Sequence, residues 1–192
     1  MIELSRRELI AAMTAATVML RPTDAQASHA SLVVRRQLAT GRYDPRIYTP
    51  HEWETVRTLV DYIFPRDERS GSATDALVPE FMDTMLVLEP GMRTAHRGGL
   101  AWLDAECRER FGANFIACSD EQRRAVLDDI AWPARARADL SHGVQWFNSF
   151  RDLCATGFWT SEIGIEDLGY QGNTPVAEWT GCPGENLRRL GF

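Results

Sequence analysis

The chain has 192 residues, 44% of them hydrophobic and 25% charged, a composition that excludes disordered and fibrous proteins and a length that suits one domain. A formal net charge of −6 and a pI of about 5.3 argue against a protein that binds nucleic-acid phosphates. All 21 basic residues are arginine, so lysine Schiff-base catalysis and a P-loop lysine are excluded too.

Residues 1–27 are predicted to be a twin-arginine signal peptide. The adjacent Arg6 and Arg7 precede an apolar run over residues 9–20, which is too short and too mildly hydrophobic to anchor the chain in a bilayer. The segment Ala25-Gln26-Ala27 then places small residues at the −3 and −1 positions of a signal-peptide cleavage site after Ala27. This order of features is typical of the address that sends folded bacterial proteins to the periplasm. The alternative is an amphipathic first helix in which the arginine pair is coincidental.

The first helix of the body is predicted to begin at Thr49. Its hydroxyl can cap the helix, Pro50 suits the first helical position, and Glu52 completes a capping box. Pro65 then ends the helix. Further helices are predicted from apolar residues at helical spacing near 78–89 and 92–111, from the capping box at Ser119 to the stop at Pro133, and over about 142–158.

The predicted fold is therefore all-α, a compact bundle of about five helices. It occupies residues 46–192 and follows a linker or N-terminal arm over residues 28–45. No segment alternates apolar and polar residues for long enough to predict a β-rich fold. In the helix predicted near 92–111, Gly98 and Gly99 would allow another backbone to approach closely. Acidic pairs at 104/106 and 128/129 are expected on solvated helix faces.

From Thr160 onward the sequence predicts an irregular tail. Residues 161–192 hold six glycines and two prolines, yet they remain rich in large apolar side chains. A flexible linker would be polar, so these side chains must be buried against the helical body or against another protein. The candidates for a partner interface are Trp159, Ile163, Ile165, Tyr170 and Trp179.

Cofactor and catalytic motifs are missing from the sequence. The four cysteines form no C-x-x-C, no two histidines are four residues apart, and neither a dinucleotide-binding glycine pattern nor a G-x-S-x-G elbow is present. We therefore expect no catalytic, cofactor-binding or metal-binding residue in this chain. Cys107 and Cys154 fall on apolar helix faces and are expected as buried thiols, whereas Cys182 is the best candidate for a disulfide, within the chain or to a partner.

The tail sequence GFWTSEIGIEDLGYQGNTP over residues 157–175, followed by WTGCP at 179–183, resembles the gluconate 2-dehydrogenase subunit 3 family. The segments at 49–53, 63–67 and 97–112 extend the resemblance over about residues 46–190. It implies a small subunit that carries the twin-arginine signal. The large partner would be a glucose–methanol–choline (GMC) type flavoprotein with FAD, often joined by a multihaem cytochrome c, and any membrane association would arise through this complex.

Three hypotheses remain at this point. The first is a non-catalytic small subunit that binds, stabilises and escorts an FAD-dependent sugar or alcohol dehydrogenase. The second is a stand-alone periplasmic helical binding protein without a flavoprotein partner. The third is a small enzyme that uses scattered residues such as His96, His142 and Asp139, which the spacing does not support.

Overall fold

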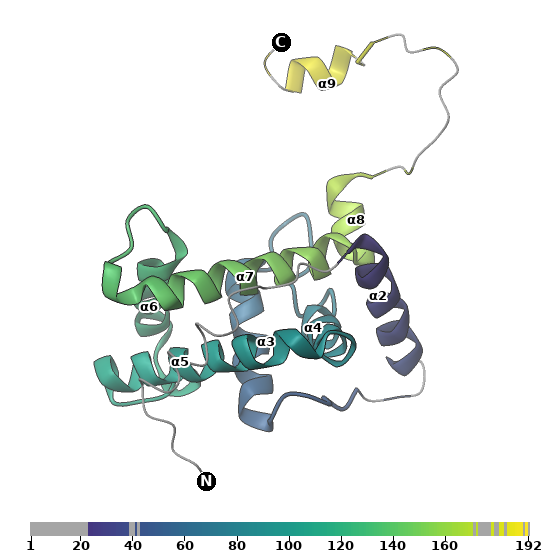
Figure 1. The fold of residues 1–192 in the computed structure, drawn as a ribbon. Coiled ribbons are helices and arrows are strands. Elements are labelled where there is room, and N and C mark those ends of the chain that lie inside the picture. Colours follow the sequence, from purple (N-terminus) through teal and green to yellow (C-terminus); the bar gives the residue numbers. More distant parts are fainter. Residues whose placement is uncertain are drawn as a thin grey trace.

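A computed structural model describes residues 23–38, 41, 43–170, 172, 178, 181–182, 184–189 and 191. Within them the chain is helical, and none of these residues belongs to a β-strand (Figure 1). The α-helices are α2 (Asp24–Leu38), α3 (Pro50–Ile63), α4 (Val78–Leu88), α5 (Arg93–Phe111), α6 (Asp120–Ala131), α7 (Ser141–Trp159), α8 (Glu162–Leu168) and α9 (Gly184–Arg189). Short 3₁₀ turns are η1 (Pro90–Met92), η2 (Phe115–Ala117) and η3 (Ala138–Leu140).

The all-α prediction is confirmed. The five helices predicted from the sequence correspond to α3, α4, α5, α6 and α7. Three further helices are present among the described residues. Helix α2 occupies most of the segment expected as a linker, and α8 and α9 lie in the tail expected to be irregular. Arg6 and Arg7 lie outside the described residues.

Helix ends follow the local chemistry of the sequence. The Thr49 hydroxyl accepts the Glu52 N–H at 3.2 Å while the Glu52 carboxylate accepts the Thr49 N–H at 2.8 Å, which is the predicted capping box of α3. Ser119 and Gln122 repeat this exchange at the start of α6. Reciprocal caps of this kind satisfy backbone donors that a helix leaves unpaired, so they fix where α3 and α6 begin.

Helix α7 is central to the fold. It contacts α2, α3, α4, α5, α6 and α8, and it lies alongside α5 as the second long helix in Figure 1. Its inward side chains include Phe150, Leu153 and Phe158, each at most 2% exposed. The core is therefore assembled around one helix.

The packing of α5 on α7 depends on two glycines and two tryptophans. A Cβ added to Gly99 would lie 1.9 Å from Cδ1 of Trp146, and one added to Gly143 would lie 2.1 Å from Cη2 of Trp102. The indole of Trp146 on α7 thus packs on Gly99 of α5, and the indole of Trp102 on α5 packs on Gly143 of α7. The prediction of a close approach at Gly99 is correct, but the approaching group is a side chain and not a backbone. A larger residue at either glycine would force an indole out of a close-packed core.

None of the helices in the described part of the chain is long and apolar enough to cross a membrane.

Candidate functional site

Helix α8 is fixed against the end of α7 by one glycine. The Ser161 hydroxyl caps α8 by accepting the Gly164 N–H at 3.0 Å. Gly164 is buried, and a Cβ at this position would lie 2.0 Å from the carbonyl oxygen of Phe158. Only glycine allows so close an approach to a neighbouring backbone. The contact between Gly164 and the Phe158 carbonyl therefore fixes the position of α8 against the helical body.

Helix α8 ends at a glycine in the left-handed conformation. Gly169 has φ +64°, its N–H donates to the Glu166 carbonyl at 2.9 Å, and the Tyr170 N–H donates to the Ile165 carbonyl at 3.1 Å. This is the hydrogen-bond pattern of a Schellman motif, in which the residues at the positions of Tyr170 and Ile165 frequently make an apolar contact.

Three large apolar side chains are exposed on α8 and directly after it. Ile165, Leu168 and Tyr170 are 37%, 59% and 56% exposed, which is unusual for large apolar residues so close together in sequence. We call these three residues the α8 face. Leu168 was not among the predicted interface residues, although its spacing of three from Ile165 would have placed the two on one face had a helix been predicted here.

Two of the predicted interface residues turn inward instead. Trp159 is half-buried, with its ring centroid 5.6 Å from that of Phe64 and 5.0 Å from that of Phe158, both in edge-to-face geometry. Ile163 is half-buried and packs against the core beside Gly71. Both side chains therefore help to hold α8 against the helical body. Trp179 lies outside the described residues.

Charged groups and a hollow border the α8 face. The Arg69 guanidinium donates to the Asp167 carbonyl at 2.8 Å and lies 3.1 Å from the Asp167 carboxylate. Beside the helix is a hollow of about 390 Å³ between α2, α4, α7 and α8, lined by apolar residues such as Val34 and Phe81 and by the carboxylates Glu162 and Glu166. Apolar groups with a charged rim are the usual composition of a protein interface.

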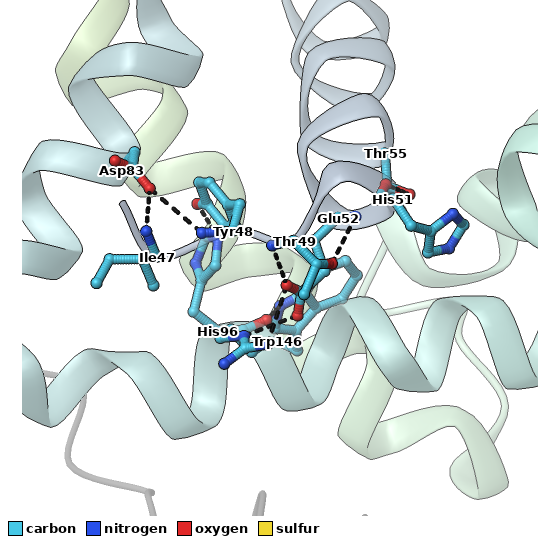
Figure 2. A network of polar contacts seen from close by, with 10 residues as sticks. Ile47, Tyr48, Thr49, His51, Glu52, Thr55, Asp83, His96 and Trp146 are labelled. Atoms are coloured by element: carbon cyan, nitrogen blue, oxygen red, sulfur yellow. Dashed lines mark hydrogen bonds and ion pairs between the residues drawn. The ribbon is translucent and has the colours of Figure 1, made fainter. Parts of the chain in front are cut away.

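A buried polar network lies elsewhere, between α3, α4 and α5 (Figure 2). The fully buried Asp83 carboxylate accepts the N–H groups of Arg46 and Ile47, both at 2.9 Å, and the Tyr43 hydroxyl at 2.8 Å. The Tyr48 hydroxyl and His96 Nε2 are hydrogen-bonded at 2.8 Å. These groups hold the segment before α3 against α4 and α5.

Burial lowers the pKa of His96 to about 4, because the charged imidazolium would lose its hydration among Tyr48 and Phe150. At neutral pH the ring is thus uncharged and inaccessible to a substrate. Asp139 forms an ion pair with Arg137, and His142 lies at the start of α7. The structure assigns His96 and Asp139 to contacts within the fold, so the geometry offers the small-enzyme hypothesis no support.

Acidification is expected to destabilise the fold through His96. Between the folded pKa of about 4 and an unfolded value of about 6.5 the unfolded chain binds the proton and the folded chain does not, so stability falls as pH falls through this window. Between pH 7 and pH 5 the loss from this group is about 2 kcal/mol. Urea unfolding at both pH values should show a smaller pH dependence in His96→Asn, whereas the exposed His29→Asn should match the parent chain. Equal pH dependence in all three proteins would contradict this assignment.

Two carboxylates expected on a solvated face are buried. Asp104 accepts the Phe115 N–H at 2.9 Å and pairs with His51, and Glu106 lies 2.8 Å from the Arg110 guanidinium. The solvated-face prediction is wrong for this pair. The segment after α5 folds back onto Asp104, and Glu106 is paired with Arg110, which also binds Asp129 of α6. Over the described ranges, no three His, Cys, Asp or Glu side chains gather where they could hold a metal ion.

A family model described as gluconate 2-dehydrogenase subunit 3 matches residues 50–181, more than half of the chain. The chain belongs to this family. The match confirms the resemblance predicted from the tail sequence. Membership of this family makes the protein a subunit of a multi-subunit dehydrogenase complex. No curated protein and no solved structure matches the chain.

The subunit 3 match begins at the first residue of α3 and extends beyond α8. The α8 face is thus part of the family's domain, while α2 precedes it. In a protein that works as one subunit among several, an exposed apolar face on a rigid helix is the first place to seek a contact with another subunit.

Proposed function

We propose that this chain is a non-catalytic small subunit that binds, stabilises and escorts an FAD-dependent GMC-type dehydrogenase for export. FAD would be held by the large subunit, this chain would hold no cofactor, and a cytochrome c would be a further component. The twin-arginine signal at Arg6 and Arg7 would direct the assembled pair to the periplasm. Any membrane association would arise through the complex.

The observation that carries this proposal is the α8 face. Ile165 and Leu168 lie on α8, whose position is fixed by Gly164, and Tyr170 is tied to the end of the helix by its N–H bond to the Ile165 carbonyl, so docking would cost little ordering entropy. Aromatic side chains such as Tyr170 are enriched among the residues that supply most binding energy at interfaces. A subunit that binds only the folded partner stabilises that partner by mass action.

The proposal is tested by co-expressing this chain, with a C-terminal tag, together with the neighbouring open reading frames. Tag purification from the periplasmic fraction is expected to yield a yellow flavoprotein in the complex. The double variant Arg6→Lys/Arg7→Lys should abolish recovery of both proteins from the periplasm. Its control is Arg35→Lys/Arg36→Lys, a second adjacent arginine pair at the end of α2, which should leave export unchanged.

A colourless chain that is exported alone would contradict the escort proposal. That result would favour the stand-alone periplasmic binding protein. Export that does not depend on Arg6 and Arg7 would contradict the predicted signal while leaving the subunit contact to be judged from the co-purified flavoprotein.

A further inference from the structure

Two buried cysteines meet where the chain reverses after α5. Cys107 lies on α5 and is 0% exposed, and Cys118 follows η2 and is 4% exposed. Gly112, with φ +73°, ends α5 and turns the chain back. The returning segment is held on α5 because the Phe115 N–H donates to Asp104 Oδ1 at 2.9 Å.

The Asp104–Phe115 hydrogen bond sets the two cysteines beside each other, since Cys107 lies one turn beyond Asp104 on α5 and Cys118 lies three residues beyond Phe115. Cys118 is close enough to contribute to the raised pKa of the Cys107 thiol, and its own thiol donates to the Ala113 carbonyl at 3.8 Å. Arg123 fixes the same segment from α6, since its Nε donates to the Phe115 carbonyl at 2.9 Å. The fold therefore brings together two sulfurs that are 11 positions apart in the sequence.

We propose that Cys107 and Cys118 are a disulfide-forming pair, oxidised when the folded chain meets a small-molecule or protein disulfide. The less buried Cys118 loses its proton and attacks one sulfur of the oxidant, which releases the first thiolate. Cys107 then loses its proton and attacks the Cys118 sulfur of the mixed disulfide, which releases the second. Two electrons and two protons pass to the oxidant, which ends as two thiols.

The same contact predicts slow oxidation of the native chain. Burial and the neighbouring Cys118 raise the pKa of the Cys107 thiol to about 12, and only the thiolate is reactive. The bond should therefore form during local opening of the segment after Gly112. The proposal does not depend on the proposed function, because its test uses the purified chain and a chemical oxidant.

The purified full-length chain is first reduced, then equilibrated with oxidised glutathione, alkylated and digested with trypsin. Because the chain has no lysine, trypsin cleaves only after arginine and separates Cys107 in peptide 98–108 from Cys118 in peptide 111–123. We expect these two peptides to be recovered as one disulfide-linked species. The bond closes a loop of 12 residues, so the oxidised chain should melt about 5 °C or more above the reduced chain.

Variants identify the bond. The link should persist in Cys182→Ser and Cys154→Ser and be lost in Cys118→Ser. Since the parent chain itself supplies the linked peptides, the test does not depend on the folding of Cys118→Ser. Recovery of both peptides with alkylated thiols, after refolding from urea in the same glutathione buffer, would overturn the proposal. So would preferential linkage of Cys107 to Cys154 or Cys182.

Discussion

Replacing Asp83 with alanine is expected to lower the free energy of unfolding by about 4 kcal/mol, because several donors lose one buried acceptor together. The N–H groups of Arg46 and Ile47 and the Tyr43 hydroxyl all donate to this carboxylate, which is 0% exposed. The Tyr43 hydroxyl also lies 3.3 Å from the Glu80 carbonyl and from Thr84 Oγ1, so the larger loss falls on the two backbone N–H groups. Urea unfolding followed by circular dichroism at pH 7 measures the change.

Two variants calibrate this result. Asp83→Asn keeps the shape of the side chain but presents an amide NH₂ toward donors. Its free energy of unfolding should therefore lie between that of the parent chain and that of Asp83→Ala. Asp128→Ala, an exposed carboxylate on α6, should change stability by less than about 0.5 kcal/mol. A loss at Asp83 no larger than that at Asp128 would contradict the anchoring role of the carboxylate.

Removing the α8 face is expected to have the largest effect on assembly. In Leu168→Ala/Tyr170→Ala two large exposed side chains are truncated, and the affinity for the proposed flavoprotein subunit should fall about 100-fold or more. The fold should be unaffected, since both side chains are more than half exposed. Co-purification with the tagged chain and a titration against the isolated large subunit give the measurement.

Trp132→Ala is the matched control for the α8 face. This residue is equally large and 58% exposed, but it lies at the end of α6. It should leave complex recovery unchanged. A third variant, Gly164→Ala, should weaken assembly without altering any exposed side chain. The added methyl group would clash with the Phe158 carbonyl and displace α8 from its position. Normal assembly of the double variant, or a greater loss of complex recovery in Trp132→Ala, would contradict the proposal that the α8 face contacts the partner.

The helical body could be predicted because its signals are local. Capping residues such as Thr49 and Ser119 are close in sequence to the donors they satisfy, so α3 and α6 begin where the pattern places them. The sequence pattern does not predict α8, because glycines such as Gly164 and Gly169 are typical of irregular chain. Gly169 is in fact the left-handed end of the helix, and Gly164 is required by the Phe158 carbonyl, a contact that depends on the tertiary fold.

The candidate site was predicted in part for a related reason. The tail sequence predicted an apolar segment that contacts either the helical body or a partner. It did not predict where α8 starts, and the start of the helix decides which side chains face out. Ile165 and Tyr170 are exposed as an interface requires, whereas Trp159 and Ile163 face the body. Burial of Asp104 likewise depended on the reversal at Gly112, whose path over α5 is not encoded in the helical pattern.

The position of α7 in the sequence has a consequence for synthesis. This helix contacts six other helices of the body, yet it is the last of the long helices to leave the ribosome. A nascent chain that ends before Ser141 would leave the apolar faces of α5 and α6 without their main neighbour. The core would therefore close late, after nearly the whole chain has been translated, and the amino terminus would emerge well before there is a folded domain behind it.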